Sequence, residues 1–170
     1  EAALDTVLAA VGCDRASILL FDEKRVMRFE ASRGISKRYR QAVEGHSPWK
    51  PDTKNPAPVC FSDVGNAKLA KSLKTVIGAE GIHAAAFIPL VADGKLIGKF
   101  MVYFNAPHSF TENELRLATT IGRQVTQAIQ HKRDEEALRE SEARMRATVE
   151  QATAGMARWS VDGRLLFANQ

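Results

Sequence analysis

The sequence has few cysteines, no long apolar run and no strong excess of charge, and each absence excludes a class of protein. Its 170 residues include two cysteines, Cys13 and Cys60, without metal-type spacing and too few for a disulfide framework. This usage favours a reducing, cytoplasmic location. No apolar run approaches the roughly 18 residues that span a bilayer, so no membrane segment is expected in this stretch. The opening EAALDTVLAAVG lacks the basic start and cleavage site of a signal peptide, and it predicts an amphipathic helix.

The net charge of +4 does not predict a nucleic-acid-binding surface. Residues 1–110 hold 15 Lys and Arg against 11 Asp and Glu, whereas residues 111–170 hold 9 of each kind. The excess is scattered, and Lys71 and Lys74 lie beside Leu69 and Leu73 at helical spacing, which is typical of a solvated helix face. With 45% hydrophobic residues, the chain can bury a core of one full domain plus an appendage.

Apolar runs predict two pairs of strands. Residues 16–21 and 26–33 flank the polar stretch 22–25 and form one hairpin. Residues 82–91 and 95–104 flank Asp93-Gly94, a dipeptide typical of a tight turn, and form the other hairpin. The second pair is too apolar for a sheet with one wet face, so we expect layers on both sides.

Three helices and one loop precede or separate these strands. The first helix runs to about Val11 and ends at Gly12. Ser36 caps a short helix that turns Tyr39 and Val43 inward. Residues 45–58 contain four prolines and form a loop, and Asn66 then caps a helix with one apolar face, made of Leu69, Leu73, Val76 and Ile77.

Thr111 and Glu114 form a T-x-x-E capping box, which predicts the start of a long helix. Apart from Gly122, no Gly or Pro interrupts it before Gly155, so it must extend beyond a compact domain. Apolar residues recur along this helix every three or four residues, as in a coiled-coil seam, and two consecutive steps of three occur once. This pattern predicts a dimeric connector whose coiled-coil register is only moderately specified. The seam comprises Ile121, Val125, Ala128, Leu138, Met145, Val149 and Ala152, with polar positions at Lys132, Glu135 and Glu142.

The order helix, strand pair, Pro-rich segment, helix, strand pair and long helix resembles a GAF domain, most clearly in EGIHAAAFIPLVADGKLIGKFMVYFNAPHSFTENEL, residues 80–115. Residues 137–170 resemble the lead-in helix and first two strands of a PAS domain. We therefore predict a GAF-like domain at 1–110, a signalling helix at 111–151 and a truncated PAS-like start at 152–170. The truncated part cannot bury its own core, so residues 156–170 are expected to be disordered or to pack opportunistically.

The resemblance implies an α+β, layered fold: an antiparallel sheet of five or six strands, with helices on both faces and a small-molecule pocket. It implies a non-catalytic, cytoplasmic sensory region of a histidine kinase, acting as a homodimer on downstream PAS and effector domains. Three alternatives stay open: the regulatory domain of a diguanylate cyclase, a ligand-free dimerisation module, and a free methionine sulfoxide reductase that would use Cys13 and Cys60.

The cofactors known in the family find little support in the sequence. Bilin-binding GAF domains typically carry a histidine beside the attachment cysteine, but here Asp14 follows Cys13 and Phe61 follows Cys60. Haem requires a histidine that projects into an apolar cavity, and His83, at the start of a strand, favours a hydrogen-bonded core histidine. The Asn-Lys pair of the cyclic-nucleotide binders is missing. No metal motif occurs, and the ligand stays unidentified.

Alternation along the second strand pair predicts the pocket wall. His83, Ala85 and Phe87 share one face of their strand, and Lys99, Met101 and Tyr103 share one face of the next. Because the terminal helices should cover the opposite face, we assign this set to the pocket. A buried Lys99 must meet an acid, an anionic ligand or water. From the loops, the cavity could be closed by Tyr39, His46, Trp49 and Cys60, although Trp49 could equally plug the loop onto the core.

Overall fold

The structure, a computed structural model, describes residues 2–150 and 157–168. It divides into two compact units, Glu1–Gln127 and Ala128–Gln170. Within the described residues, none of the helices has the length and apolarity that a membrane crossing requires.

The first unit is built on a five-stranded antiparallel sheet with the order β2-β1-β5-β4-β3. Both predicted hairpins are present, and the β4–β5 turn places Asp93 and Gly94 at φ 49° and 72°, as a tight two-residue hairpin requires. The α+β fold expected from the sequence is confirmed, with five strands. The strands are β1 (Arg15–Phe21), β2 (Met27–Arg33), β3 (Val59–Phe61), β4 (Ala84–Ala92) and β5 (Lys95–Phe104).

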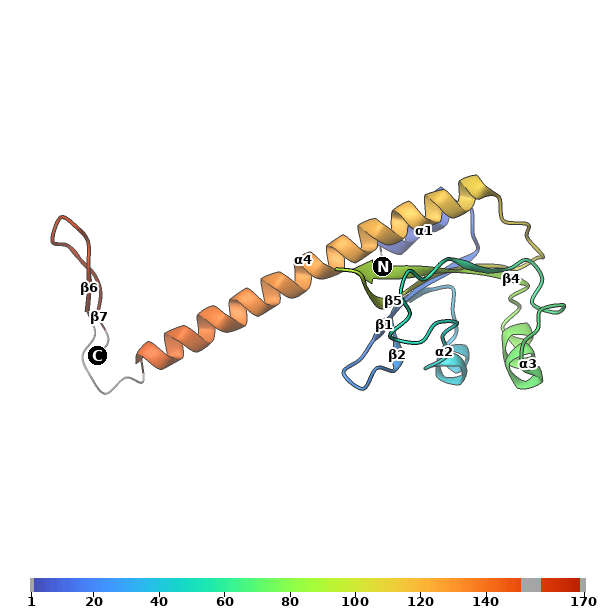
Figure 1. The fold of residues 1–170 in the computed structure, drawn as a ribbon, viewed down its shortest axis with the longest axis horizontal. Helices are drawn as coiled ribbons and strands as arrows, with labels where there is room; N and C mark the ends of the chain where they lie inside the picture. The colour runs from blue at the N-terminus through green and yellow to red at the C-terminus, as the bar shows by residue number, and fades with distance from the viewer. Residues whose placement is uncertain (1, 151–156, 169–170) are drawn as a thin grey trace. The chain divides into compact units, whose positions relative to one another are not determined.

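Helices cover both faces of this sheet. Figure 1 shows α1 (Ala2–Val11) and the first part of α4 (Glu112–Glu150) on one face, and α2 (Lys37–Val43) and α3 (Lys71–Ala79) on the other. Gly122 allows α4 to approach the sheet closely, because a Cβ there would lie 3.1 Å from Cγ2 of Ile88. The helix continues through Gly122, so this glycine serves packing and does not end the helix.

The predicted N-caps at Ser36 and Thr111 are confirmed. Ser36 Oγ accepts a hydrogen bond from the Tyr39 amide at 3.1 Å. Thr111 Oγ1 accepts from the Glu114 amide at 3.2 Å, and Glu114 Oε2 accepts in return from the Thr111 amide at 2.7 Å. These bonds satisfy amide groups that have no partner within the helix.

The predicted cap at Asn66 is wrong. Helix α3 begins at Lys71, five residues later. The Asn66 side-chain Nδ2 donates instead to Asp63 Oδ2 at 2.7 Å, within a turn in which Asp63 Oδ1 accepts from the Gly65 backbone amide. Asx side chains stabilise such turns as readily as they cap helices, so the residue type alone could not separate the two structures.

Neighbouring residues of β4 and β5 point to opposite sides of the sheet. One side packs against α4, as the contact with Gly122 shows for Ile88 and Leu90. The other side carries Ala85, Met101 and Tyr103, which belong to a core cluster with residues of α2 and α3. The sheet therefore separates an α1–α4 layer from an α2–α3 layer, as the apolar strands predicted.

The second unit contains the rest of α4 and a hairpin of β6 (Ala157–Trp159) and β7 (Leu165–Ala168). The Ser160 amide donates to the Arg164 carbonyl at 2.7 Å, and Gly163 adopts φ 79° in the turn. Residues 157–168, for which the sequence predicted either disorder or opportunistic packing, form a hairpin of two strands. Seam position Ala152 and the rest of the predicted PAS-like start, 152–156 and 169–170, lie outside the described residues.

Candidate functional site: a cavity containing a buried lysine

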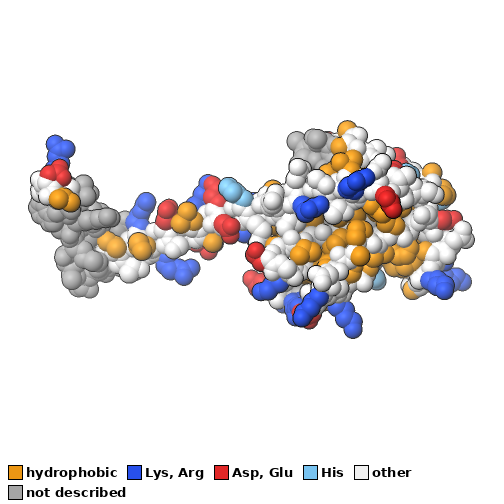
Figure 2. All heavy atoms as spheres, turned by 45° about the horizontal axis from the view of Figure 1, so that its top comes forward, with side chains coloured by type: hydrophobic (Ala, Val, Ile, Leu, Met, Phe, Trp, Pro, Cys, Tyr) orange, Lys and Arg blue, Asp and Glu red, His pale blue; other side chains and the backbone are white. Residues whose placement is uncertain are grey.

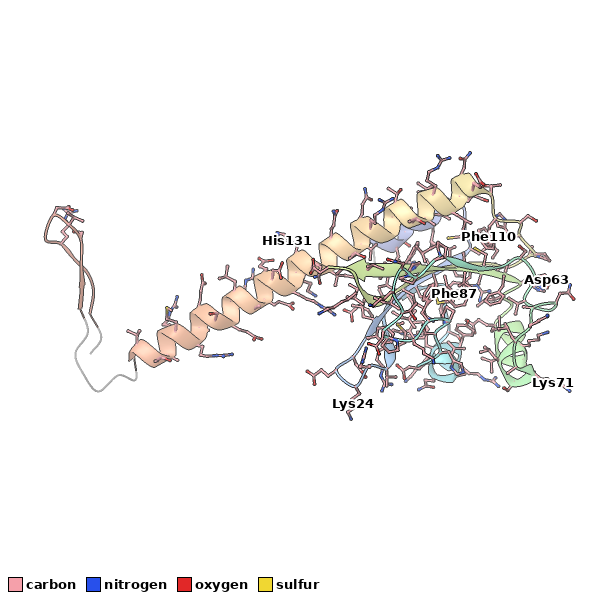
Figure 3. All side chains as sticks on the ribbon, viewed as in Figure 1. Lys24, Asp63, Lys71, Phe87, Phe110 and His131 are labelled. Carbon is pink, nitrogen blue, oxygen red and sulfur yellow. The ribbon has the colours of Figure 1, made fainter. Side chains whose placement is uncertain are left out.

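A cavity of about 160 Å³ lies on the face of the sheet that α2 and α3 cover. Residues of β1, β2, β3, β4 and β5 form its floor, and α2, α3 and the loop after α2 form its other walls. Phe87, labelled in Figure 3, contributes to the floor from β4. The lining of the cavity is almost entirely apolar. It consists of Leu19, Phe29, Tyr39, Val43, His46, Ser47, Pro48, Phe61, Leu69, Leu73, Ile77, Phe87, Lys99 and Met101.

Lys99 supplies the charge in this lining, and its residue surface is only 3% exposed. Its Nζ donates to the main-chain carbonyl of His46 at 2.6 Å and lies 5.1 Å from the centre of the Phe87 ring. Burial lowers the pKa of Lys99 to about 7, and no charged neighbour adds to that shift. Among the described residues, then, a carbonyl and an aromatic ring stabilise this ammonium, and no carboxylate does so.

The loop segment 46–48 forms the rim of the cavity. His46 and Pro48 line the cavity and are also exposed to solvent, while Ser47 is half-buried. The carbonyl that holds Lys99 belongs to this rim. The lysine thus tethers a solvent-facing loop to the buried floor of the sheet.

Two tyrosines stabilise the wall beside the cavity. Tyr39 meets Tyr103 edge to face, with ring centres 6.3 Å apart. The Tyr103 hydroxyl lies 2.8 Å from Ser17 Oγ and 3.3 Å from Met101 Sδ. Burial raises the pKa of both phenols, so both stay neutral and neither provides a counter-charge for Lys99.

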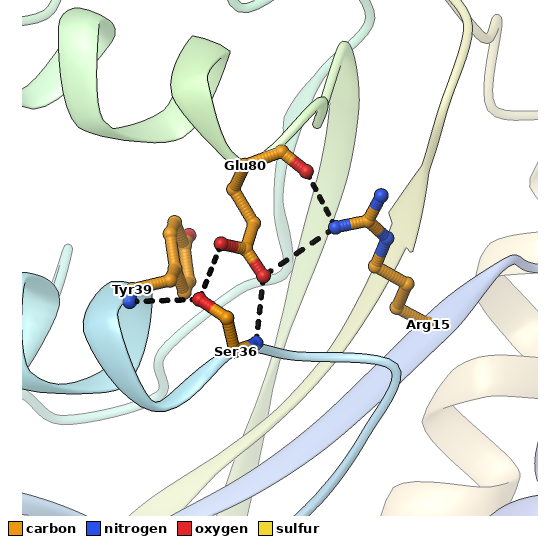
Figure 4. A network of polar contacts seen from close by, with 4 residues as sticks. All are labelled: Arg15, Ser36, Tyr39 and Glu80. Carbon is orange, nitrogen blue, oxygen red and sulfur yellow. Dashed lines mark hydrogen bonds and ion pairs between the residues drawn. The ribbon is translucent and has the colours of Figure 1, made fainter.

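A polar network ties the two covering helices to the sheet (Figure 4). The Glu80 carboxylate, at the end of α3, accepts from the Ser36 amide at 2.7 Å and from its hydroxyl at 2.6 Å. Arg15 of β1 donates to the Glu80 carbonyl at 2.6 Å and lies 3.5 Å from its carboxylate. Because Ser36 caps α2, one carboxylate connects the start of α2, the end of α3 and β1.

The structure brings three of the seven predicted pocket residues to the lining: Tyr39, His46 and Lys99. Tyr103 is fully buried behind Tyr39 and Met101, within the core cluster. Trp49 is buried outside the lining, which agrees with the alternative that it plugs the loop onto the core.

Cys60 and His83 do not line the cavity either. Cys60 pairs with Ala86, so it shares the α4 side of the sheet, while its neighbour Phe61 faces the cavity. His83 precedes β4 and is exposed, and its amide donates to the Phe104 carbonyl.

The missed lining residues come mainly from elements whose direction the sequence did not specify. Phe29 and Phe61 lie on strands with weak alternation, so their side could not be assigned in advance. Leu69, Leu73 and Ile77 formed the apolar face expected for the third helix, and this face was the available signal for a second wall of the cavity.

The two cysteines lie far apart in the sheet. Cys13 precedes β1 and Cys60 lies in β3, with β5 and β4 between these strands, which implies roughly 14 Å at about 4.8 Å per strand. A disulfide needs Cα atoms within about 7 Å. Burial raises the pKa of Cys13 to about 11 and also raises that of Cys60, so both favour the unreactive thiol. This geometry argues against methionine sulfoxide reduction by a cysteine pair.

Residues 1–130 match the family model described as "GAF domain". A domain of a predicted two-component sensor histidine kinase from Sinorhizobium meliloti 1021 is 50% identical, with a TM-score of 0.77 over 82% of this chain and 94% of that one. The GAF domain region of a predicted membrane protein from Geobacter sulfurreducens PCA is 25% identical, with a TM-score of 0.61 over 76% and 89%.

The GAF domain of PixJ from Thermosynechococcus elongatus, in its blue-light absorbing form, shares the fold at 17% identity, with a TM-score of 0.67 over 83% of this chain and 88% of that one. The comparison with curated proteins gave no match. Among the described residues, no group of three or more His, Cys, Asp or Glu side chains could hold a metal ion.

Proposed function

Because the chain belongs to the GAF domain family, we propose that it is the non-catalytic, signal-sensing region of a two-component sensor histidine kinase. It binds a small molecule in the cavity and passes the bound state to the domains that follow. The single observation that carries this proposal is the apolar cavity with a buried Lys99 that has no carboxylate partner among the described residues. The 50% identical domain favours a histidine kinase over a diguanylate cyclase as the output.

The sheet offers a route from the cavity to the signalling helix. Lys99 and Met101 line the cavity, while Phe100 and Val102, between and beside them on β5, point to the opposite side. A ligand that shifts the cavity residues changes the packing of that opposite side, on which α4 lies. Ligand binding then shifts the equilibrium between two arrangements of α4. The coupling free energy between the cavity and α4 is expected to be about 1–3 kcal/mol.

The partner of α4 in this proposal is α4 of a second copy. Large apolar side chains remain exposed along the helix: Leu117 is 41% exposed, Leu138 60% and Met145 70%. Figure 2 shows hydrophobic side chains distributed among charged ones along the helix. Leu138 and Met145 are seven residues apart, the spacing that a two-helix coiled coil buries. A homodimer would cover both residues and lead into the PAS-like segment and effector.

We place the protein in the cytoplasm in this proposal. Proteins with few cysteines and no disulfide framework are typical of a reducing compartment, and this chain has two free cysteines. The location agrees with a sensor that reads a metabolite and acts on a kinase in the same compartment.

Native mass spectrometry and analytical ultracentrifugation of the purified chain test the proposal together. We expect a dimer that carries a small molecule and that dissociates in Leu138→Asp. The matched control is Ala137→Asp, which adds the same charge one residue away, on the outward side of the seam. A dimer with no ligand under any purification condition would favour a dimerisation module, and monomers at high concentration would contradict the relay.

A further inference from the structure

Taking the ligand-binding function proposed above as its premise, we infer that the ligand is a small apolar monocarboxylate, with its carboxylate on the Lys99 ammonium and its apolar part against the sheet. The class follows from three properties of the cavity: its size, the single cation in its lining and the position of the rim.

The volume limits the apolar part of the ligand. An apolar protein cavity of about 150 Å³ accommodates a benzene molecule. The cavity here measures about 160 Å³, so it holds about six non-hydrogen atoms of hydrocarbon. Nucleotides, haem and tetrapyrroles are several times larger, and a ring or short chain fits.

The charge selects an anion. An ammonium group has three N–H donors, and one of them reaches the His46 carbonyl. The other titratable side chains on the lining are Tyr39, which burial keeps neutral, and His46, which is exposed at the rim. The lining therefore offers an anion a buried cation and no buried anion to repel it.

The rim explains how such a ligand would act. A carboxylate bound to the two remaining N–H donors of Nζ neutralises the ammonium charge, and this charge strengthens the hydrogen bond to the His46 carbonyl. Occupancy would then loosen the tether between the 46–48 loop and β5, whereas an uncharged ligand would leave the tether in place. The charge of the ligand is thus both the recognition element and the trigger.

Isothermal titration calorimetry with benzoate and benzyl alcohol tests the inference at pH 6.5. The two probes share the ring and differ in charge. We expect the wild-type chain to bind benzoate about 10- to 100-fold more tightly, the range typical of a charge-assisted hydrogen bond. Lys99→Met should abolish this preference. Lys95→Met, which removes an exposed lysine from the same strand, should retain it.

The outcomes separate this inference from the proposed function. Benzyl alcohol binding as tightly as benzoate in the wild-type chain, or a benzoate preference that survives in Lys99→Met, would overturn the carboxylate assignment alone. If the chain co-purifies with a neutral molecule and binds neither probe, the carboxylate assignment is also overturned. The proposed sensor function would then still hold. The wild-type comparison does not depend on the folding of any variant.

Discussion

At the scale of single residues, the sequence predicted that Lys99 lies in the pocket, and the structure places it in the cavity lining. Alternation placed this lysine on the buried, cavity side of its strand, which is where it lies. Burial in an apolar environment penalises the charged form, so the side chain should destabilise the empty domain at neutral pH. A buried charge that lowers the stability of the ligand-free domain is expected at a position where the function requires that charge.

This penalty gives a pH dependence with a definite sign. The pKa of Lys99 falls from 10.5 to about 7 on folding, so between these values the unfolded chain binds a proton that the folded chain lacks. The free energy of unfolding contributed by Lys99 therefore rises with pH, by up to about 1.4 kcal/mol per unit. Above pH 9, Cys13 acts in the opposite direction, because burial raises its pKa to about 11.

Lys99→Met should therefore be more stable than the wild-type chain at pH 7, and the gap should narrow as the pH rises to 8.5. Urea unfolding at several pH values measures this difference directly. Lys95→Met provides the control, since an exposed lysine should give a pH profile parallel to the wild type. A constant gap across this range would mean that Lys99 is not the titrating group.

Residue-level prediction was successful where the chain has a fixed period and failed where it does not. In β5 the period of two placed Lys99 and Met101 on the cavity side correctly, whereas Tyr103, on the same side, is buried outside the lining. In the three-residue β3, the side of Cys60 depends on its pairing with Ala86, which only the folded register provides. Trp49 lies in a proline-rich loop, where no periodicity indicates direction, so its burial outside the cavity could not be derived.

At the scale of elements, the corner between β5 and α4 is stabilised by aromatic stacking and by the cap of α4. His108 stacks on Phe104 with ring centres 3.9 Å apart, and Phe110, labelled in Figure 3, meets both rings edge to face. Glu114 accepts from Thr111 and lies 3.0 Å from His108 Nε2. Hydrogen bonds from Thr111 lower the pKa of Glu114, so its ionised form completes the corner.

Thr111→Ala should lower the free energy of unfolding by about 1 kcal/mol, because the Glu114 amide loses its hydroxyl acceptor. Chemical denaturation at pH 7 measures the change. Thr120→Ala is a suitable control. Thr120 is exposed, and its hydroxyl donates to the Arg116 carbonyl one turn earlier in the same helix, so its loss should change stability little. Equal losses in the two variants would show that the cap adds nothing specific.

The elements also show how far local signals extend. The capping box, the Asp-Gly turn and the apolar strands are local patterns, and each predicted its element correctly. The third helix starts later than predicted because Asp63 and Asn66 form a turn with each other. The hairpin at 157–168 has the two strands that the PAS resemblance implied, joined by a turn at Gly163.

At the scale of the whole molecule, the proposed relay is a coupling between cavity occupancy and pairing of α4. Coupling between two binding events is reciprocal: whatever the dimer does to ligand affinity, the ligand must do to dimer affinity. Both quantities can be measured on this chain with benzoate as the probe. Their agreement tests the relay without any knowledge of the output domain.

Benzoate affinity in the monomer and in the dimer should differ by some factor. Because a dimer has two equivalent cavities, saturating benzoate should change the dimer dissociation constant by the square of that factor. The Leu138→Asp monomer supplies the first affinity and the wild-type dimer the second, with a ratio of roughly 5 to 150 expected for a typical allosteric coupling. Calorimetry gives the affinities, and ultracentrifugation with and without benzoate gives the dissociation constants. Ala137→Asp should reproduce the wild type in both measurements. A dimer constant that ignores benzoate, together with equal affinities in monomer and dimer, would mean that the sheet does not transmit the state of Lys99 to α4.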